Sequence, residues 1–224
     1  MIRRDYILRM IEECIRALAR INSLKQDQRW TEASVELDGE FRKLLGAGAP
    51  EVARLSESDL LARLMQDGPT HALREKTLML TTLLKEAGDV AATAERTEES
   101  HGCYRKALHL LLEVLARGEV FEGPAFVPKV ERLRAALAGA PLSGRTHAML
   151  MQHYERTGEF AKAEDALFVL LDAESDNPAL VEFGITFYQR LLALSDAVLT
   201  AANLPRAEVA GGLQELQQRR KRGE

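Results

Sequence analysis

The pattern of a helical hairpin at residues 146–178 constrains the fold of this chain more than any other stretch. Its first half places Leu150 and Tyr154 four residues apart, on one face of a helix. Gly158 follows, and glycine commonly ends a helix because it reaches backbone angles that other residues avoid. The apolar positions then resume at a spacing of three to four residues, at Phe160, Ala163, Leu167 and Leu170. The pattern predicts two antiparallel helices packed against each other.

The composition extends this prediction to the whole chain. The 224 residues are 46% hydrophobic and 29% charged, which is ordinary for a folded protein and too apolar for a disordered one. Leu, Ala, Glu and Arg, which favour helices, are abundant, and the alternation typical of strands is missing. We therefore expect an all-α protein.

Residues 1–68 are predicted to form an N-terminal helical region. Helices are expected over residues 4–26 and 30–45, and near 51–55. Gly46-Ala47-Gly48-Ala49-Pro50 should end the second of these, because glycine and proline both interrupt helices. Ser58 is expected to cap one more helix, and Gly68-Pro69 then marks the end of the region.

Residues 69–224 are predicted to form a helical repeat region. Besides the hairpin at 146–178, helices are expected over 70–94, 97–117, 128–138, 178–194 and 195–201, and from Pro205 onward. The small residues Gly88, Ser100 and Ala107 should allow the helices 70–94 and 97–117 to approach closely.

These two hairpins resemble the tetratricopeptide family, whose units of about 34 residues are helix pairs. The phrase Cys103-Tyr104-Arg105-Lys106-Ala107-Leu108 is the most typical part. The sequence departs from the family at Glu95, where glycine is usual, at His147, where a large aromatic is usual, and in the additional helix 128–138. The resemblance implies helical hairpins stacked as a short, irregular right-handed array behind the N-terminal helical region.

Three phrases together resemble a bacterial family of uncharacterised tetratricopeptide-like proteins, a domain of unknown function. They lie at residues 4–13, 103–113 and 204–216, and read RDYILRMIEE, CYRKALHLLLE and LPRAEVAGGLQEL. This resemblance implies a bacterial cytoplasmic protein and brings no activity with it.

The tetratricopeptide resemblance also implies a function, that of a non-catalytic scaffold or adaptor which binds a peptide or protein on its concave helical face. The positions that would face this groove are Lys85, Asp89, Arg145, Met149, Gln152 and Arg156. Members that grip a C-terminal carboxylate use asparagines where this chain has Asp89 and Gln152, so we do not expect that kind of clamp.

The helix predicted over 4–26 carries an apolar stripe that allows a second hypothesis. Its members alternate at spacings of four and three: Ile7, Ile11, Cys14, Leu18 and Ile21. Such a stripe packs a helix onto its own protein or onto a second copy, which would make the chain a homo-oligomeric structural protein, possible as a homodimer. A membrane-surface role is disfavoured because Glu12 and Glu13 share the polar face with arginines.

No motif in the sequence indicates catalysis, a cofactor or a metal. His101, Cys103 and His109 have no metal-ligand spacing, and no glycine-rich phosphate loop is present. An enzyme or small-ligand site assembled from distant residues, between the N-terminal helices and the repeats, remains a third hypothesis.

The charge and the cysteines bear on partners and location. A net charge of -4 and 5% aromatic residues disfavour a nucleic-acid partner. No apolar run approaches the ~20 residues needed to span a bilayer, so no membrane partner is expected. Two distant cysteines, Cys14 and Cys103, favour a reduced, cytoplasmic setting.

Overall fold

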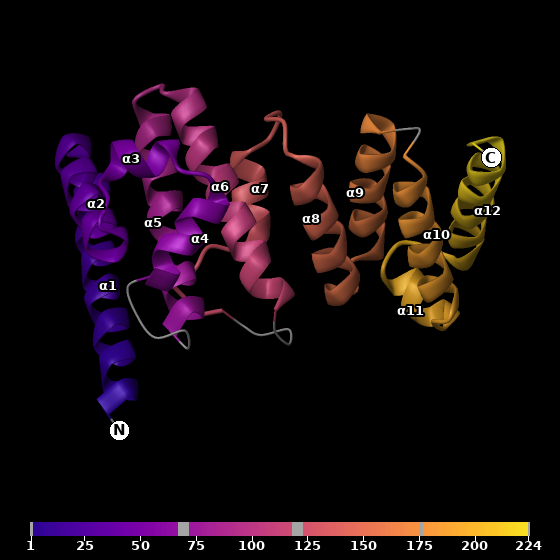
Figure 1. The fold of residues 1–224 in the computed structure, drawn as a ribbon, viewed down its shortest axis with the longest axis horizontal. Coiled ribbons are helices and arrows are strands. Elements are labelled where there is room, and N and C mark those ends of the chain that lie inside the picture. The colour runs from indigo at the N-terminus through magenta and orange to yellow at the C-terminus, as the bar shows by residue number, and fades with distance from the viewer. Residues whose placement is uncertain (1, 67–71, 118–122, 175–176, 224) are drawn as a thin grey trace. The chain divides into compact units, whose positions relative to one another are not determined.

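The structure, a computed structural model, describes residues 2–66, 72–117, 123–174 and 177–223. These residues form twelve α-helices and contain no β-strand, which confirms the all-α prediction for the described chain (Figure 1). Contacts between residues divide the protein into two units, Met1–Pro141 and Leu142–Glu224. We refer to them as unit 1 and unit 2.

Unit 1 is built around two helical hairpins. Its helices are α1 (Ile2–Gln26), α2 (Trp30–Leu45), α3 (Ala49–Arg54), α4 (Glu57–Gln66), α5 (Leu73–Thr93), α6 (Thr97–Ala116) and α7 (Val130–Ala136). Helix α1 pairs with α2, and α5 pairs with α6; the first hairpin packs on α5, and α7 packs on α6 (Figure 1).

Unit 2 contains the helical hairpin predicted over residues 146–178. Its helices are α8 (Gly144–Thr157), α9 (Phe160–Ala173), α10 (Pro178–Leu192), α11 (Asp196–Ala201) and α12 (Arg206–Gly223). Helices α8 and α9 form the predicted pair, and α10 packs mainly on α12.

The division into units differs from the one expected at Gly68-Pro69, a position that lies outside the described residues. Helices α1, α2 and α4 all pack on α5, so the N-terminal helices share one core with the α5–α6 hairpin. Every residue from Lys76 to Glu86 is buried, because neighbouring helices surround α5. The N-terminal helices and this hairpin therefore form one packed body.

Three helical hairpins reverse direction through the same backbone turn, which also joins α11 to α12, where Asn203 has a φ of 56° and Leu204 N donates to Leu199 O at 3.0 Å. A residue with a positive φ follows the first helix of each pair: Gln28 at 58°, Glu95 at 58° and Gly158 at 78°. The amide of the residue directly before the second helix then closes the turn by donating to the carbonyl five residues back. These bonds are Arg29 N to Leu24 O at 2.8 Å, Arg96 N to Ala91 O at 2.9 Å, and Glu159 N to Tyr154 O at 2.8 Å. The α1–α2 pair is thus a third hairpin of this geometry, which the sequence analysis had not grouped with the other two.

The predicted close approach of α5 and α6 is confirmed. A Cβ atom at Gly88 would lie 2.8 Å from the ring of Tyr104, and the hydroxyl of Ser100 donates to the Gly88 carbonyl at 2.9 Å. Ala107 is fully buried. A larger side chain at position 88 would push the helices apart.

The ends of α2 and α4 test two local predictions. Helix α2 ends at Leu45, and Gly46 takes up the left-handed conformation with φ of 68°, as the glycine-rich stretch indicated. The predicted cap at Ser58 is wrong, because Ser58 lies inside α4. Ser56 is the cap instead: its hydroxyl accepts from Asp59 N at 3.1 Å, while the Asp59 carboxylate accepts from Ser56 N at 3.1 Å.

Two long cationic side chains satisfy the carbonyl ends of helices other than their own. Lys106 of α6 donates to Val52 O at 2.9 Å and Ala53 O at 2.6 Å, at the end of α3. Arg206 of α12 donates to Leu192 O at 2.8 Å and also to Leu194 O. Each of these side chains places its positive charge at the C-terminal, negative end of a helix dipole.

Helices α10 and α12 approach through two glycines. A Cβ at Gly184 would lie 2.5 Å from Leu216 Cδ1, and a Cβ at Gly212 would overlap the ring of Tyr188, 2.7 Å from its Cε1 atom. Tyr188 is fully buried, and its hydroxyl donates to the Glu164 carboxylate of α9 at 2.6 Å. One tyrosine therefore joins α9, α10 and α12.

We expect Gly212→Ala to destabilise unit 2 by about 2 kcal/mol, because the new methyl group must displace the Tyr188 ring. Gly211→Ala is the matched control: nothing lies within 4 Å of its added Cβ, and alanine favours helix, so it should be neutral or stabilising. Hydrogen exchange of α10 amides measures both. Equal protection in the two variants would contradict the close approach.

We expect Glu95→Gly to stabilise unit 1 by about 1 kcal/mol, because glycine adopts the positive φ of this turn without steric cost. The control Glu98→Gly places glycine within the first turn of α6 and should destabilise the unit by about 1 kcal/mol. Urea unfolding followed through Trp30, the only tryptophan, measures both. A destabilised Glu95→Gly variant would show that the turn tolerates glutamate without strain.

Candidate functional site

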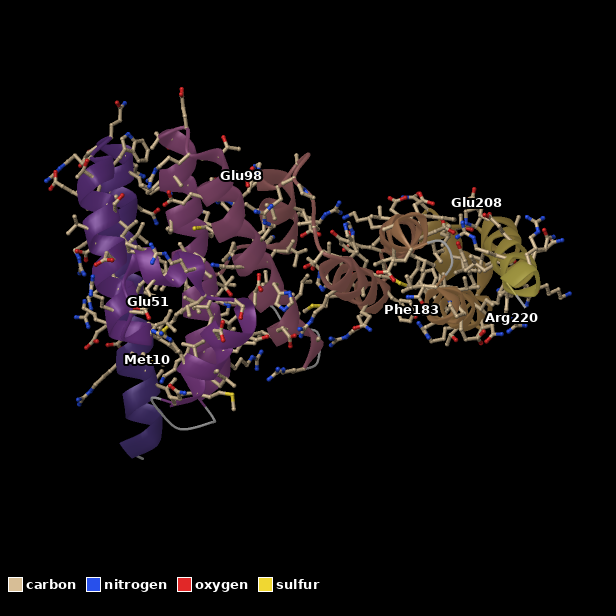
Figure 2. The ribbon with its side chains drawn as sticks, turned by 45° about the horizontal axis from the view of Figure 1, so that its top comes forward. Met10, Glu51, Glu98, Phe183, Glu208 and Arg220 are labelled. Atoms are coloured by element: carbon tan, nitrogen blue, oxygen red, sulfur yellow. The ribbon has the colours of Figure 1, made fainter. Side chains whose placement is uncertain are left out.

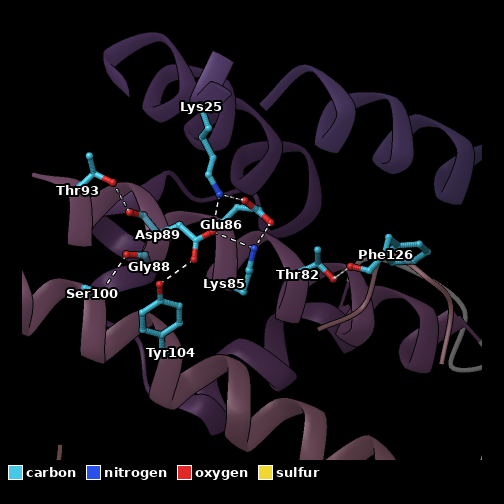
Figure 3. Close-up of polar contacts among 10 residues, drawn as sticks. All are labelled: Lys25, Thr82, Lys85, Glu86, Gly88, Asp89, Thr93, Ser100, Tyr104 and Phe126. Atoms are coloured by element: carbon cyan, nitrogen blue, oxygen red, sulfur yellow. Dashed lines mark hydrogen bonds and ion pairs between the residues drawn. The ribbon is translucent and has the colours of Figure 1, made fainter. Parts of the chain in front are cut away.

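Four charged residues form a cluster between α1 and α5 (Figure 3). The Lys25 ammonium at the end of α1 contacts the carboxylates of Glu86 and Asp89. The Lys85 ammonium lies 2.8 Å from Glu86 Oε1 and 2.9 Å from Asp89 Oδ2. Two cations thus face two carboxylates, and the cluster is formally neutral. We call these four residues the ion cluster.

The ion cluster lies largely out of water. Lys85 and Glu86 are 6% and 4% exposed, and α5 supplies three of the four members from adjacent positions and successive turns. A buried ammonium or carboxylate is costly unless an opposite charge and hydrogen bonds compensate it. Lys25 therefore completes, from α1, a balance that α5 alone does not have.

Tyr104 of α6 extends the ion cluster to a third helix. Its hydroxyl donates to Asp89 Oδ1 at 2.7 Å. Burial acts to raise the pKa of the Asp89 carboxyl, but the hydrogen bonds from Lys25, Lys85 and Tyr104 together lower it below its ordinary value. Burial, followed by the bond to Asp89, raises the pKa of the Tyr104 phenol. Asp89 is therefore a carboxylate, and Tyr104 a neutral donor, at neutral pH.

An open cleft of about 650 Å³ lies beside the ion cluster, within unit 1. Lys25, Lys85 and Glu86 line one part of it. The rest of the lining comes from α1, α5, the segment before α7, and α7 itself: Leu18, Asn22, Thr82, Ala125, Phe126, Val127, Pro128, Lys129, Glu131 and Arg132. We call this the α1–α5–α7 cleft.

One wall of the cleft is the segment 125–129, which precedes α7 and contacts α5. The Thr82 hydroxyl bonds Leu78 O at 3.0 Å and lies 3.5 Å from Phe126 O, as Figure 3 shows for Thr82 and Phe126. Pro128 is buried, and Lys129 then stands at the N-cap position of α7 in an extended conformation. The segment thereby presents apolar side chains beside exposed cations.

The charged residues that line the cleft are of two kinds. The buried ion cluster forms its floor, and exposed side chains form its rim. Lys129 and Arg132 are exposed, as is Glu131 between them in sequence. Asn22 on α1, also exposed, offers an amide donor and acceptor. These side chains, unlike Lys85, are accessible to a partner.

The structure corrects the expected role of Lys85 and Asp89. Both were predicted to face an open groove, but Lys85 is buried and Asp89 is engaged by two ammonium groups and a phenol. Lys85 reaches the cleft only as part of its lining. The burial of Lys85 was not expected from the sequence, because the helical pattern of α5 does not show that neighbouring helices enclose it.

The four predicted residues of α8 lie on one side of their helix in unit 2. Arg145, Gln152 and Arg156 are exposed and Met149 is half-buried. Their spacing of four, three and four residues places them on one face. They belong to unit 2, whereas the cleft belongs to unit 1, so the cleft does not include them.

The apolar stripe of α1 divides into two parts. Cys14, Leu18 and Ile21 are 7%, 5% and 0% exposed and belong to the core of unit 1. Ile7 and Ile11 are only half-buried. The second half of the stripe therefore packs α1 onto its own chain.

The cysteines and histidines singled out from the sequence do not form a reactive centre among the described residues. Burial raises the pKa of the Cys14 thiol to about 12 and that of Cys103 to about 11, so both are protonated thiols at neutral pH. His109 is buried, 3.7 Å from Glu113. Within 2–66, 72–117, 123–174 and 177–223, no three His, Cys, Asp or Glu side chains are grouped as a metal site would require.

None of the described helices has both the length and the hydropathy needed to cross a bilayer.

The α1–α5–α7 cleft was not predicted from the sequence. Its residues come from three segments, and Lys25 and Glu86 are 61 positions apart. The only local signal was the turn-rich stretch before α7, where apolar residues precede Lys129.

We expect Asp89→Asn to destabilise unit 1 by about 3 kcal/mol at pH 7, because two ammonium groups would then share one carboxylate. The folded-state pKa of Asp89 is below its ordinary value of 3.8. The contribution of the carboxylate is therefore complete above this value and is lost as the pH falls through the folded pKa.

Urea titrations followed through Trp30 across this pH range test the prediction. The difference between wild type and variant should be constant near neutrality and should shrink in acid. Glu51→Gln removes one member of a more exposed ion pair with Arg63 and should have a much smaller effect. A difference between wild type and Asp89→Asn that grows in acid would contradict the assignment.

Comparisons with known proteins define the family of this chain. A search of curated proteins and a search of solved structures each gave no significant match. A family model described as a family of unknown function, DUF6483, matches residues 1–221. The chain, with its ion cluster and its cleft, belongs to the DUF6483 family.

Proposed function

We propose that this chain is a non-catalytic protein-interaction module that binds an extended peptide segment of a partner in the α1–α5–α7 cleft. The observation that carries the proposal is the combination in one open cleft of an apolar wall, a preorganised polar floor and exposed cations. A short, irregular, right-handed tetratricopeptide-like stacking of hairpins is part of this proposal. The turn shared by the α1–α2, α5–α6 and α8–α9 pairs supports it.

The cleft offers the two kinds of contact by which peptides are recognised. Leu18, Phe126 and Val127 supply apolar surface, and aromatic or aliphatic anchors in such pockets contribute most of the affinity of many interfaces. Asn22 can bond a peptide main chain, which exposes both a donor and an acceptor at each residue. At about 650 Å³, the cleft is within the range of ordinary ligand sites.

The charges indicate the kind of segment that fits. The two cations of the floor are balanced by Glu86 and Asp89, so they add little net attraction. Lys129 and Arg132 at the rim are opposed by Glu131 alone, which leaves one positive charge. We therefore expect a segment in which an acidic residue lies close to an aliphatic or aromatic one. The whole chain is acidic, and this local positive charge would orient such a segment.

A peptide-selection experiment on the full chain tests the proposal. Random peptides displayed on phage are selected against the wild type, and the affinities of enriched peptides are measured at fixed salt. We expect Arg132→Glu to weaken the selected peptides about tenfold, since a favourable charge pair becomes repulsive. The matched control is Arg134→Glu, which makes the same charge change on the exposed side of α7 outside the cleft.

Two outcomes would overturn this assignment. Selected peptides that bind Arg132→Glu and Arg134→Glu equally well would exclude the α1–α5–α7 cleft as the site. Failure to enrich any acidic peptide would remove the expected specificity. Reversing Lys85 is not a test of binding, because a third carboxylate beside Glu86 and Asp89 would destabilise the fold itself.

Self-association is a second candidate function, which the N-terminal half of α1 favours. Leu8 and Ile15 are 50% and 45% exposed, beside the half-buried Ile7 and Ile11. A homodimer through these residues would be compatible with peptide binding elsewhere on unit 1. Sedimentation equilibrium distinguishes the cases: a chain that stays monomeric at high concentration has no such interface.

The proposal includes a reduced, cytoplasmic setting. Cys14 and Cys103 are both free thiols, and neither is fully exposed. This agrees with a compartment in which disulfides are rare.

A further inference from the structure

Few apolar side chains hold α12 in unit 2. Among the described residues of this helix, Val209 and Leu216 are buried, seven positions apart and therefore on one face. Leu204, just before the helix, is buried as well. A segment with a small apolar contact opens more readily than a core helix, so the polar groups at the same interface influence how often α12 detaches.

The contact of α12 with its neighbours centres on Tyr188 of α10. The tyrosine ring is fully buried against Gly212 of α12, and its hydroxyl donates to Glu164 Oε1 of α9 at 2.6 Å. Glu164 itself is half-buried. A carboxylate at such a position loses part of its hydration and receives this hydrogen bond in return. We call Glu164, Tyr188 and Gly212 the Tyr188 junction.

Carboxylates from two helices act on the Tyr188 junction. Asp165 follows Glu164 on α9, and α12 contributes Glu208 and Glu215. Figure 2 labels Glu208 on α12. The carboxylates of Glu208 and Asp165 disfavour a negative charge on Glu164, and that of Glu215 disfavours one on Tyr188. Ionised Glu164 therefore repels the helix that the junction holds.

Cations on the same three helices are paired with other carboxylates. The pairs are Arg206 with Asp196, Lys162 with Glu159, Arg190 with Glu155, and Arg220 with Glu182. The remaining cations of these helices, at positions 219, 221 and 222, belong to the C-terminal end of α12. None of the four pairs includes Glu164, so they do not offset its negative charge.

These surroundings favour the protonated form of Glu164. Burial is the main reason that the pKa of its carboxyl is raised above the ordinary value of 4.5, and the hydrogen bond from Tyr188 opposes this shift without reversing it. A carboxyl with a raised pKa binds its proton more tightly in the folded protein than in the unfolded chain. Its contribution to stability is therefore complete below 4.5 and is lost as the pH rises through the folded pKa.

We propose that the Tyr188 junction is an acid-sensitive contact, which holds α12 against α9 and α10 more tightly when Glu164 is protonated. The neutral carboxyl still accepts the hydrogen bond from Tyr188 and no longer repels Glu208 across the interface. At neutral pH the ionised carboxylate weakens the contact, so α12 detaches more often. This device lies within unit 2, and it does not depend on the peptide cleft proposed in unit 1.

Hydrogen exchange of the full chain, measured by nuclear magnetic resonance from neutral pH down to about pH 5, tests the proposal. The α12 amides report its opening once intrinsic exchange at each pH is taken into account. Glu164→Gln is neutral at every pH and can accept the same hydrogen bond. We expect it to protect α12 more than the wild type does at neutral pH. This gain should be lost as the pH falls, because the wild type then becomes neutral too.

Glu98→Gln is the matched control, since it makes the same change in unit 1 at a side chain that is 90% exposed. It should leave the protection of α12 unchanged at every pH. The proposal is overturned if Glu164→Gln protects α12 no better than the wild type does. It is also overturned if the variant is less protected at neutral pH, because the bond from Tyr188 to the carboxylate would then outweigh burial and repulsion.

A direct titration keeps the test independent of how glutamine packs. The ¹³C shift of the Glu164 carboxyl carbon should titrate with a midpoint above 4.5 in the wild type. The midpoint should fall in Glu208→Gln, which removes a repelling carboxylate from α12 and leaves Tyr188 in place. A wild-type midpoint at or below 4.5, or one that Glu208→Gln leaves unmoved, would show that the junction is not the acid-sensitive contact proposed.

Discussion

Enclosing α5 in the core of unit 1 requires that its charged residues find partners of opposite sign. Lys85, Glu86 and Asp89 would leave one negative charge in excess on α5, and Lys25 of α1 supplies the missing cation. An uncompensated charge at such a site costs several kcal/mol. The ion cluster therefore favours the one arrangement of the α1–α2 hairpin that brings Lys25 over α5, in addition to what apolar packing contributes.

The pairing of these buried charges also limits the contacts that the neighbouring cleft could make with a partner. Because the ammonium groups of Lys25 and Lys85 are already bonded within the protein, a partner gains little by approaching them and would have to break existing ion pairs. The free energy of binding must come from the apolar wall and the exposed rim, where Lys129 and Arg132 lie. In the function we propose, side chains whose charges are already paired before a partner arrives would reduce the entropy lost on binding.

What the sequence could predict follows from the range of the interactions. Hairpins α5–α6 and α8–α9 depend on local periodicity and on a turn, and both were predicted. The environment of Lys85 depends on distant parts of the chain, as the 61 positions between Lys25 and Glu86 show. No pattern on α5 itself distinguishes an enclosed charge from a solvated one. The α1–α5–α7 cleft, assembled from three segments, was out of reach for the same reason, as was the contact of Gly212 with Tyr188.

The α1–α2 hairpin shows why a repeated structure can lack a repeated sequence. Its turn has the left-handed residue and the closing hydrogen bond of the other two hairpins, yet that residue is Gln28 where α8–α9 has Gly158. In each hairpin the residue before the second helix also pairs with the third residue of that helix: Arg29 with Glu32, Arg96 with Glu99, and Glu159 with Lys162. The signs are reversed in the third pair, so the identity of the residues is not conserved between hairpins while the contact is. The three hairpins therefore have the backbone geometry of the turn in common, and different residues adopt it at different steric cost.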